Sequence, residues 1–182
     1  MAETYNWENL VKSLLSINAE NGLPEDVFLA VSTLVPITNV DLLILDDNKR
    51  ILLTRRSDHF FGDGWHIPGG CVRFKETMLE RVQKTAINEL GSDVTIEPNP
   101  IAVRDVIINT QRRSIANNNY RAHHIAVLFK CHLPEDYVPE NKNLNENSPG
   151  FIKWFDKLPS NLLQVHDVYL NDIIQEMVGD QV

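Results

Sequence analysis

The chain has 182 residues, of which 43% are hydrophobic and 23% charged, and its formal net charge is −8. A chain of this length is expected to form one domain with a core large enough to fold without covalent staples. The acidic balance argues against a general surface for nucleic acid or anionic membranes, although a few arginines are enough to bind a small anion.

Targeting and redox signals are few. No segment reaches the roughly 18 consecutive apolar residues of a membrane span, and the N-terminal stretch lacks the apolar core of a signal peptide. The two cysteines, Cys71 and Cys131, are too few for a disulfide framework and do not have zinc-ligand spacing. We therefore expect free thiols and a cytoplasmic protein.

The N-terminal third of the chain predicts helix and then strand. Residues 6–19 carry apolar side chains at helical spacing, whereas the periodicity of residues 26–35 leaves helix and strand both open. The apolar runs 38–46 and 50–56 are separated by a turn-rich tripeptide and predict a β-hairpin. The glycine-rich stretch 57–70 predicts a structured loop.

A helix is expected next, over residues 76–90. Its apolar face would hold Leu79, Val82, Ala86 and Leu90, and Gly91 stands where a C-terminal cap belongs. Further along, the chain predicts strands, two polar connections and a last helix. The expected strands are 93–98, 101–109, 123–133 and 150–155, the connections are 109–121 and 134–150, and the helix is 171–178. Strands on both sides of a central helix indicate a layered α/β domain.

The pair Gly69-Gly70 before the central helix suggests a ligand site. Glycines let backbone approach a ligand closely, and the free N–H groups of a helix start suit a diphosphate. A carbonyl of this turn and the Glu89 carboxylate, near the helix end, are oxygen ligands of the kind that Mg²⁺ accepts. The alternative is a turn that only packs and a glutamate that only lies on a solvated face.

The stretch "GGCVRFKETMLERVQKTAINELGS" resembles the signature of the Nudix hydrolases, G-x5-E-x7-R-E-U-x-E-E-x-G-U, where U is apolar. The resemblance implies a Nudix-type α/β/α sandwich with a mixed β-sheet between helices. Two of the three metal-binding glutamates are replaced, and Lys84 stands for the arginine that pairs with Glu76 to brace the loop and helix. The matching positions are Gly70, Glu76, Ala86, Glu89 and Gly91, and the replaced ones are Lys84, Thr85, Asn88 and Ser92.

The same loss of metal-binding glutamates is found in one branch of that family, the GDP-mannose mannosyl hydrolases. The stretches "LPEDVFLAVSTLVPITNVDLLI", "LLTRR" and "GDGWHIPGG" also resemble this branch, in the same order. The match begins at residue 23, so we expect residues 1–22 to form an N-terminal helical extension and residues 23–182 the Nudix domain. The branch cleaves the sugar C–O bond of a nucleoside diphosphate sugar, needs Mg²⁺ (or Mn²⁺) and forms homodimers, for which residues 26–40 are a candidate surface here.

The resemblance also implies roles for individual residues. Gly69, through its carbonyl, and Glu89 match the metal ligands of the branch. Arg56 matches an arginine on the leaving diphosphate and is expected to act in catalysis. Asp41 matches a substrate-contacting aspartate, and His124 stands in the place of a substrate-contacting tyrosine. A structural role for Asp41 or His124 is the alternative in each case.

Some positions depart from the branch or stay open. Cys71 stands where the branch has an arginine after the glycine pair, and Arg73 is the nearest replacement in the sequence. Trp65, Phe60 and Phe61 either stack on a guanine base or simply pack.

The general base is the largest departure. The branch has a Gln-His pair in the loop before its last strand, and this pair falls near residues 148–149, where the loop contains no histidine. Glu146 is the nearest candidate base, because a carboxylate can serve this role in glycosyl hydrolysis. His124 and His166 are alternatives.

Three functions therefore compete. The first is a Mg²⁺-dependent hydrolase that cuts a nucleotide sugar at carbon, with GDP-mannose or GDP-glucose as the implied substrate class. The second is a pyrophosphohydrolase that attacks phosphorus, and the third is a nucleotide-sugar binding module with little or no turnover.

Overall fold

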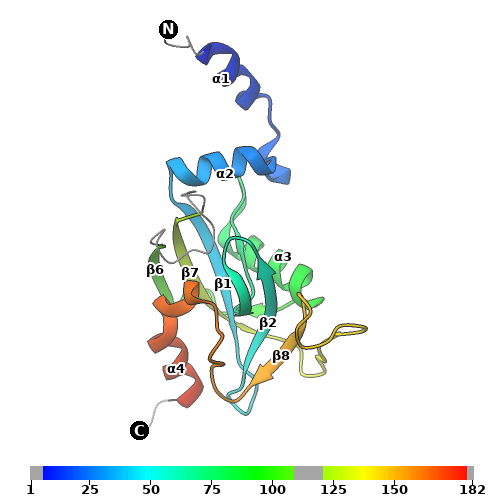
Figure 1. Ribbon diagram of the computed structural model, residues 1–182. Helices are drawn as coiled ribbons and strands as arrows, with labels where there is room; N and C mark the ends of the chain where they lie inside the picture. Colours follow the sequence, from blue (N-terminus) through cyan, green and yellow to red (C-terminus); the bar gives the residue numbers. More distant parts are fainter. Residues whose placement is uncertain (1–5, 109–120, 180–182) are drawn as a thin grey trace.

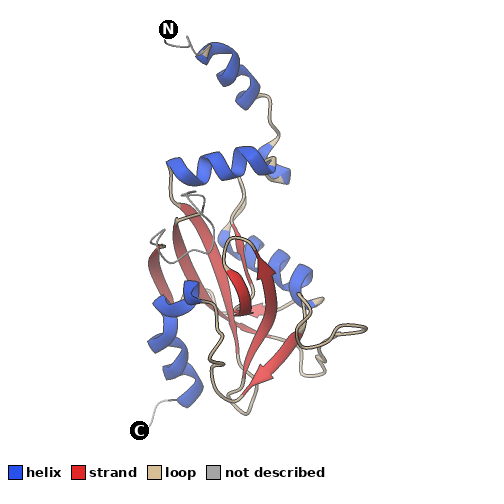
Figure 2. Ribbon diagram, in the orientation of Figure 1, coloured by secondary structure: helices blue, strands red, loops and turns tan. Residues whose placement is uncertain are grey.

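The computed structural model describes residues 6–108 and 121–179 and forms two β-sheets flanked by helices (Figures 1 and 2). In the larger sheet β1 runs parallel to β7 and antiparallel to β4, while β5 and β6 pair antiparallel with β7. In the smaller sheet β2 lies between β3 and β8. The strands are β1 (Ile37–Ile44), β2 (Ile51–Asp58), β3 (Gly62–His66), β4 (Gly69–Cys71), β5 (Thr95–Ile96), β6 (Ala102–Ile107), β7 (His123–His132) and β8 (Ile152–Phe155). The predicted α/β sandwich with a mixed sheet is confirmed.

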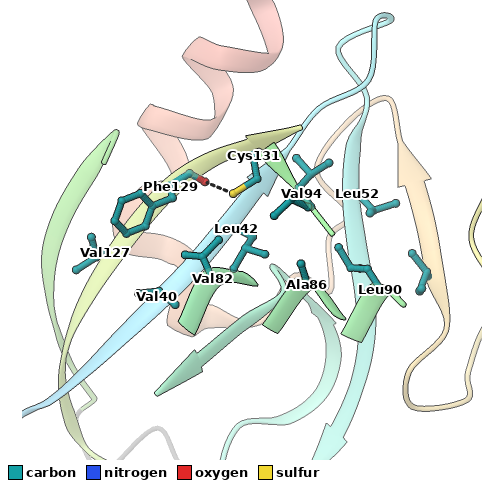
Figure 3. Close-up of a cluster of buried hydrophobic side chains, with 12 residues drawn as sticks. Val40, Leu42, Leu52, Val82, Ala86, Leu90, Val94, Val127, Phe129 and Cys131 are labelled. Carbon is teal, nitrogen blue, oxygen red and sulfur yellow. Dashed lines mark hydrogen bonds between the residues drawn. The ribbon is translucent and has the colours of Figure 1, made fainter. Parts of the chain in front are cut away.

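Side-chain alternation along β1 divides the core into two clusters. On one face Val40, Leu42 and Ile44 pack with the buried face of helix α3 (Met78–Leu90), as Figure 3 shows for the first two. On the other face Leu43 packs with residues of the short helix η3 (Gln164–Tyr169) and of α4 (Leu170–Val178). The sheets are thus covered by α3 on one side and by the C-terminal helices on the other.

Helix α3 ends at Leu90 as predicted and begins at Met78, two residues after the predicted start, because Thr77 caps it. Thr77 and Glu80 form a reciprocal capping box at its start, and Gly91 ends it in the left-handed conformation with φ of 70°. Three of the four predicted core residues of this helix are buried, but Leu79 is 41% exposed. The predicted strands after the helix are confirmed as β5 to β8 and the last helix as α4, while most of the predicted connector 109–121 lies outside the described residues.

The two strands predicted at 38–46 and 50–56 are confirmed as β1 and β2, but their predicted hairpin pairing is wrong beyond the turn. Both edges of β1 are occupied, by β4 and β7, so β2 pairs in the other sheet and a single bridge, Leu45 to Ile51, joins the two runs. Nor is the stretch 57–70 a loop, because it contains β3 and the start of β4. One of its glycines is required by packing within a strand, since a Cβ on Gly64 would lie 2.5 Å from the Asn161 carbonyl oxygen.

Two helices precede the sheets. Residues 26–35, which the periodicity left open, belong to helix α2 (Glu25–Leu34), of which Ser32 is buried. A short turn of helix, η1 (Ala19–Asn21), links it to α1 (Trp7–Leu15). Helix α1 buries none of its residues and extends away from the sheets (Figure 1). None of the helices within residues 6–108 and 121–179 has the length and hydrophobicity of a membrane-spanning segment.

The predicted brace between Glu76 and Lys84 is present, and Arg81 strengthens it. The Glu76 carboxylate accepts hydrogen bonds from Arg81 Nε at 2.7 Å, Arg81 Nη2 at 2.9 Å and Lys84 Nζ at 2.9 Å. Burial alone would raise the pKa of the Glu76 carboxyl, but these hydrogen bonds outweigh it and lower the pKa to about 2. The brace fixes the segment between β4 and α3.

We expect Glu76→Gln to lower the free energy of unfolding by on the order of 3 kcal/mol at pH 7, since the folded carboxyl ionises more readily than the unfolded one. A depressed pKa stabilises the fold above the ordinary value near 4.5 and loses that effect as the pH falls toward 2. Urea unfolding should therefore show a smaller difference between the two proteins at pH 3.5 than at pH 7. Glu140→Gln, which removes only an exposed ion pair with Lys142, is the control and should leave the stability nearly unchanged. An unchanged stability of Glu76→Gln would contradict the brace.

Candidate active site

A cavity of about 530 Å³ is lined by residues of both sheets and by the C-terminal end of α3. Five of the six predicted site residues line it, namely Asp41, Arg56, Gly69, Glu89 and His124. Glu146 does not, because it is exposed on its loop and forms an ion pair with Lys153 at 2.7 Å. The cavity therefore gathers residues from β1, β2, β4, α3 and β7, which are far apart in the sequence.

The turn at Gly69 connects two acidic residues of the cavity, Asp41 and Glu89. Gly69 is paired with Asp41 across β4 and β1, and a Cβ at position 69 would lie 2.3 Å from Asp41 Oδ1. The backbone N–H of Gly69 donates to Glu89 Oε1 at 3.3 Å. At the next position, a Cβ on Gly70 would lie 2.8 Å from the Thr85 hydroxyl of α3. The glycine pair is thus needed for the close contact of strand, helix and carboxylates.

Both carboxyl groups ionise with difficulty. Burial raises the pKa of Asp41 to about 7, against the opposing effect of hydrogen bonds from the Tyr169 hydroxyl at 3.2 Å and the Asn39 amide at 3.0 Å. Burial also raises the pKa of Glu89 to about 7, although the Gly69 N–H and the charge of Arg56 favour its ionised form. A desolvated carboxylate of this kind is stabilised when a cation binds beside it.

Within the described residues no group of three or more His, Cys, Asp or Glu side chains is arranged to hold a metal ion. Among these residues three carboxyl groups line the cavity, namely those of Asp41, Asp58 and Glu89. Asp58 is paired with Arg56, and both oxygens of Asp41 accept side-chain hydrogen bonds. We therefore assign the Glu89 carboxylate and backbone oxygens of the glycine turn as the donors for a cation. Such a set fits one hard divalent cation that completes its shell with water and ligand phosphates, and it does not fit a cluster of several cations.

Two histidines in the cavity contact the backbone of Ile67, and burial holds both in the neutral form. His66 Nδ1 lies 2.8 Å from the Ile67 carbonyl, which can only accept, so His66 Nε2 accepts the Thr54 hydroxyl at 2.6 Å. His166 Nε2 accepts the Ile67 N–H at 3.2 Å. Burial lowers the pKa of His66 to about 3 and that of His166 well below its usual range. Sequence reasoning overlooked His66. Neighbouring side chains on a strand point to opposite faces, so with Trp65 of β3 in the core, His66 points to the cavity.

Positive charge in the cavity comes from arginines. Arg56 forms an ion pair with Asp58 and lies over the Phe61 ring at 4.9 Å. Arg121, which sequence reasoning also overlooked, lines the same cavity from the segment just before β7. It is the last residue of the polar connector 109–121 and belongs to no motif, so no sequence pattern pointed to it.

Several open positions are now placed. Cys71 lines the cavity, but Arg73 points elsewhere and donates to the Asn21 carbonyl at 3.2 Å. Trp65 is buried in the core, in edge contact with Phe155 at 4.7 Å between ring centroids, so it is not available to stack on a base. Phe61 lines the cavity. As expected for neighbours on a strand, His124 is buried at the cavity, whereas His123 lies near Asp105 on the other face.

Known proteins resemble this chain in sequence and in fold. Residues 35–166 match the model of the NUDIX domain. The low-salt glycan biosynthesis protein Agl8 of Haloferax volcanii is 30% identical over 114 residues, which make up 63% of this chain and 70% of that protein.

Two solved structures, both too distant in sequence to show more than the fold, have the same architecture. A MutT NUDIX hydrolase from Burkholderia pseudomallei has a TM-score of 0.56 at 23% identity, over 75% of this chain and 97% of that one. A UDP-X diphosphatase has a TM-score of 0.54 at 21% identity, over 96% of this chain and 82% of that one. Nudix hydrolases act on small nucleotide substrates and generally use divalent metal ions. With the domain match covering most of its length, this chain belongs to the family of Nudix hydrolases.

Proposed function

We propose that the protein is a Mg²⁺-dependent hydrolase of nucleoside diphosphate sugars that attacks the sugar carbon and releases GDP and free sugar. The observation that carries this proposal is that α3 presents one carboxylate, Glu89, to the cavity. At two signature positions where the family has glutamates, Thr85 is buried beneath Gly70 and Asn88 lines the cavity as an amide.

The number of carboxylates bears on which atom is attacked. Attack on phosphorus in a typical member relies on several metal ions that activate water beside the phosphate, and one carboxylate is too few to hold them. Attack on carbon requires instead that the departing diphosphate be stabilised, which one cation and the cavity arginines are able to do. The donor set therefore favours cleavage of the C–O bond over a pyrophosphohydrolase.

Each cavity residue has a role under this proposal. Glu89 and the carbonyl of Gly69 hold Mg²⁺, for which Mn²⁺ is an expected substitute, and the bound cation supplies charge neutralisation at the diphosphate. Arg56 binds the leaving diphosphate and so lowers the energy of the transition state. Asp41 and His124 contact the substrate from β1 and β7.

Among the candidate bases, His124 is the one that this geometry favours. Glu146 is exposed and paired with Lys153, and the Nε2 atom of His166 is occupied by the Ile67 N–H. His124 is buried and lines the cavity. We propose that its imidazole accepts the proton of the attacking water.

The names of two similar proteins support a nucleotide sugar as the substrate. Agl8 is named for glycan biosynthesis, and the structurally similar diphosphatase is named for a UDP-containing substrate. We propose GDP-mannose or GDP-glucose for this chain, in a cytoplasmic protein.

We also propose that the chain forms a homodimer in which residues 26–40 take part, and that residues 1–22 are an extension of a domain formed by residues 23–182. Helix α2, in the proposed surface, buries only Ser32. Its end also exposes Leu34 at 79% and the adjoining Val35 at 53%.

Hydrolysis of GDP-mannose with Mg²⁺ in ¹⁸O-labelled water tests the position of attack. We expect the label in free mannose and unlabelled GDP, because water attacks the anomeric carbon. Mass spectrometry of the products reads this directly. Label in GMP or in mannose phosphate would instead establish a pyrophosphohydrolase, and binding without turnover across several nucleotide sugars would establish a binding module.

Glu89→Gln should lower Mg²⁺-dependent turnover by at least about 100-fold, because it removes the carboxylate that holds the cation. The matched control is Glu97→Gln, which changes an exposed glutamate near His132 and should keep activity within about twofold. Steady-state kinetics at several Mg²⁺ concentrations measures both. Full activity of the Glu89 variant would show that the metal assignment is wrong.

Mg²⁺ binding should weaken as the pH falls through about 7. The Glu89 carboxyl must release its proton before it binds a cation, and burial has raised its pKa to about 7. One such proton makes the affinity about tenfold lower at pH 6 than at pH 8, as isothermal titration calorimetry would show. Equal affinities at the two pH values would mean that Glu89 is already ionised in the metal-free protein.

A further inference from the structure

Arg121 lies at the cavity wall beside the position where the family branch would place an arginine. The Cys71 thiol is hydrogen-bonded to the Arg121 side chain, and its Sγ is 3.7 Å from Asn39 Oδ1. Both Arg121 and Cys71 line the cavity together with Arg56. A guanidinium group is therefore present at this place although the residue after the glycine pair is a cysteine.

The backbone of Arg121 is held from helix α2. Its N–H donates to the hydroxyl of Ser32 at 2.9 Å, and Ser32, which is 3% exposed, in turn donates to the Leu29 carbonyl at 2.7 Å. Arg121 adopts a φ of 55°, in the left-handed region that non-glycine residues rarely occupy. The contact with α2 holds Arg121 in this rare backbone conformation. Residues in such conformations cluster at binding and active sites.

Aromatic rings fix the guanidinium group itself. Its central carbon lies 5.7, 5.2 and 4.9 Å from the ring centroids of Phe28, Phe60 and Phe61. The same Phe61 ring is 4.9 Å from the guanidinium carbon of Arg56. Phe61 thus contacts both arginines and holds two positive groups at one cavity, in the stacked manner that suits arginine.

The guanidinium groups of Arg56 and Arg121 lie against the same Phe61 ring in one cavity and repel each other. The Asp58 carboxylate, which is paired with Arg56, offsets part of this repulsion. Burial lowers the pKa of Arg121, and the charge of Arg56 also acts to lower it. A diphosphate relieves this repulsion, and its oxygens match the planar donor fork of arginine. A neutral nucleoside offers no such gain.

We infer that Arg121 is a second substrate-binding arginine, which contacts the diphosphate together with Arg56 and takes the place of the arginine that Cys71 replaces. This inference rests on the proposed function for the identity of the substrate, and it makes Phe61 the residue that positions both guanidinium groups. The diphosphate is then bound by an arginine from the segment just before β7, and not by a residue of the glycine turn.

Binding of GDP and of guanosine to the full chain in the presence of Mg²⁺ separates this role from a structural one. Arg121→Gln should weaken GDP binding by about 10- to 100-fold and leave guanosine binding within about twofold, as measured by titration calorimetry. Arg73→Gln is the matched control, because this arginine is two residues from Cys71 but binds the Asn21 carbonyl outside the cavity lining. It should keep GDP affinity within about twofold. Equal losses for GDP and guanosine, or equal losses for the two variants, would overturn the inference.

Arg121→Lys keeps the positive charge and guards against a variant that fails to fold. Its GDP affinity should stay within about tenfold of the wild type. The lysine ammonium keeps the charge but lacks the planar donor fork of the guanidinium group. Inorganic pyrophosphate serves as the second probe and should follow GDP in all variants. Failure of the wild-type protein to bind either GDP or pyrophosphate, or full GDP affinity in both Arg121 variants, would refute the assignment.

The two proposals fail separately. Should GDP-mannose not be hydrolysed while Arg121→Gln still weakens pyrophosphate binding, the arginine assignment stands and the proposed reaction falls. Should GDP-mannose be hydrolysed with unchanged KM and kcat by Arg121→Gln, the reaction stands and the arginine assignment falls.

Discussion

The contact between Gly69 and Asp41 is the constraint on which the site depends. No side chain fits at position 69, because a Cβ would lie 2.3 Å from the Asp41 carboxylate and 2.9 Å from the Val40 carbonyl. This approach brings β4 onto β1 and lets the Gly69 N–H reach Glu89 at the end of α3. On the outer side the Glu76–Arg81–Lys84 brace holds the connection between β4 and the helix. The strand, the turn and the helix therefore position one carboxylate as a unit.

The electrostatics of the cavity follow from this packing. Buried Asp41 and half-buried Glu89 lie close enough that the charge of Glu89 raises the pKa of Asp41, and both carboxyl groups have a pKa of about 7. Arg56 favours the ionised form of each, yet it does not restore an ordinary pKa. The cavity thus combines acidic groups that gain from a cation with arginines that gain from an anion, an arrangement that suits a metal-bound diphosphate.

The sequence predicted the layers of the fold and five residues of the cavity lining, because these depend on local pattern and on a motif. Helix α3 was predictable from its capping residues and periodicity, and Gly69 and Glu89 from the signature. The pairing of β1 was not, since turn residues between two apolar runs do not reveal that β4 and β7 occupy both edges. Glu146 was favoured as a base for its place in the sequence alone, and the loop leaves it exposed beside Lys153. Arg121 depends on contacts with Ser32 and Phe61 that no local pattern encodes.

Under the proposed function, one carboxylate of α3 holds one cation, which suits departure of a diphosphate rather than activation of water at phosphorus. Electron paramagnetic resonance can count the Mn²⁺ ions bound per chain in the presence of GDP. We expect one tightly bound ion per chain, and none in Glu89→Gln. Two or more tightly bound ions per chain would contradict the proposal.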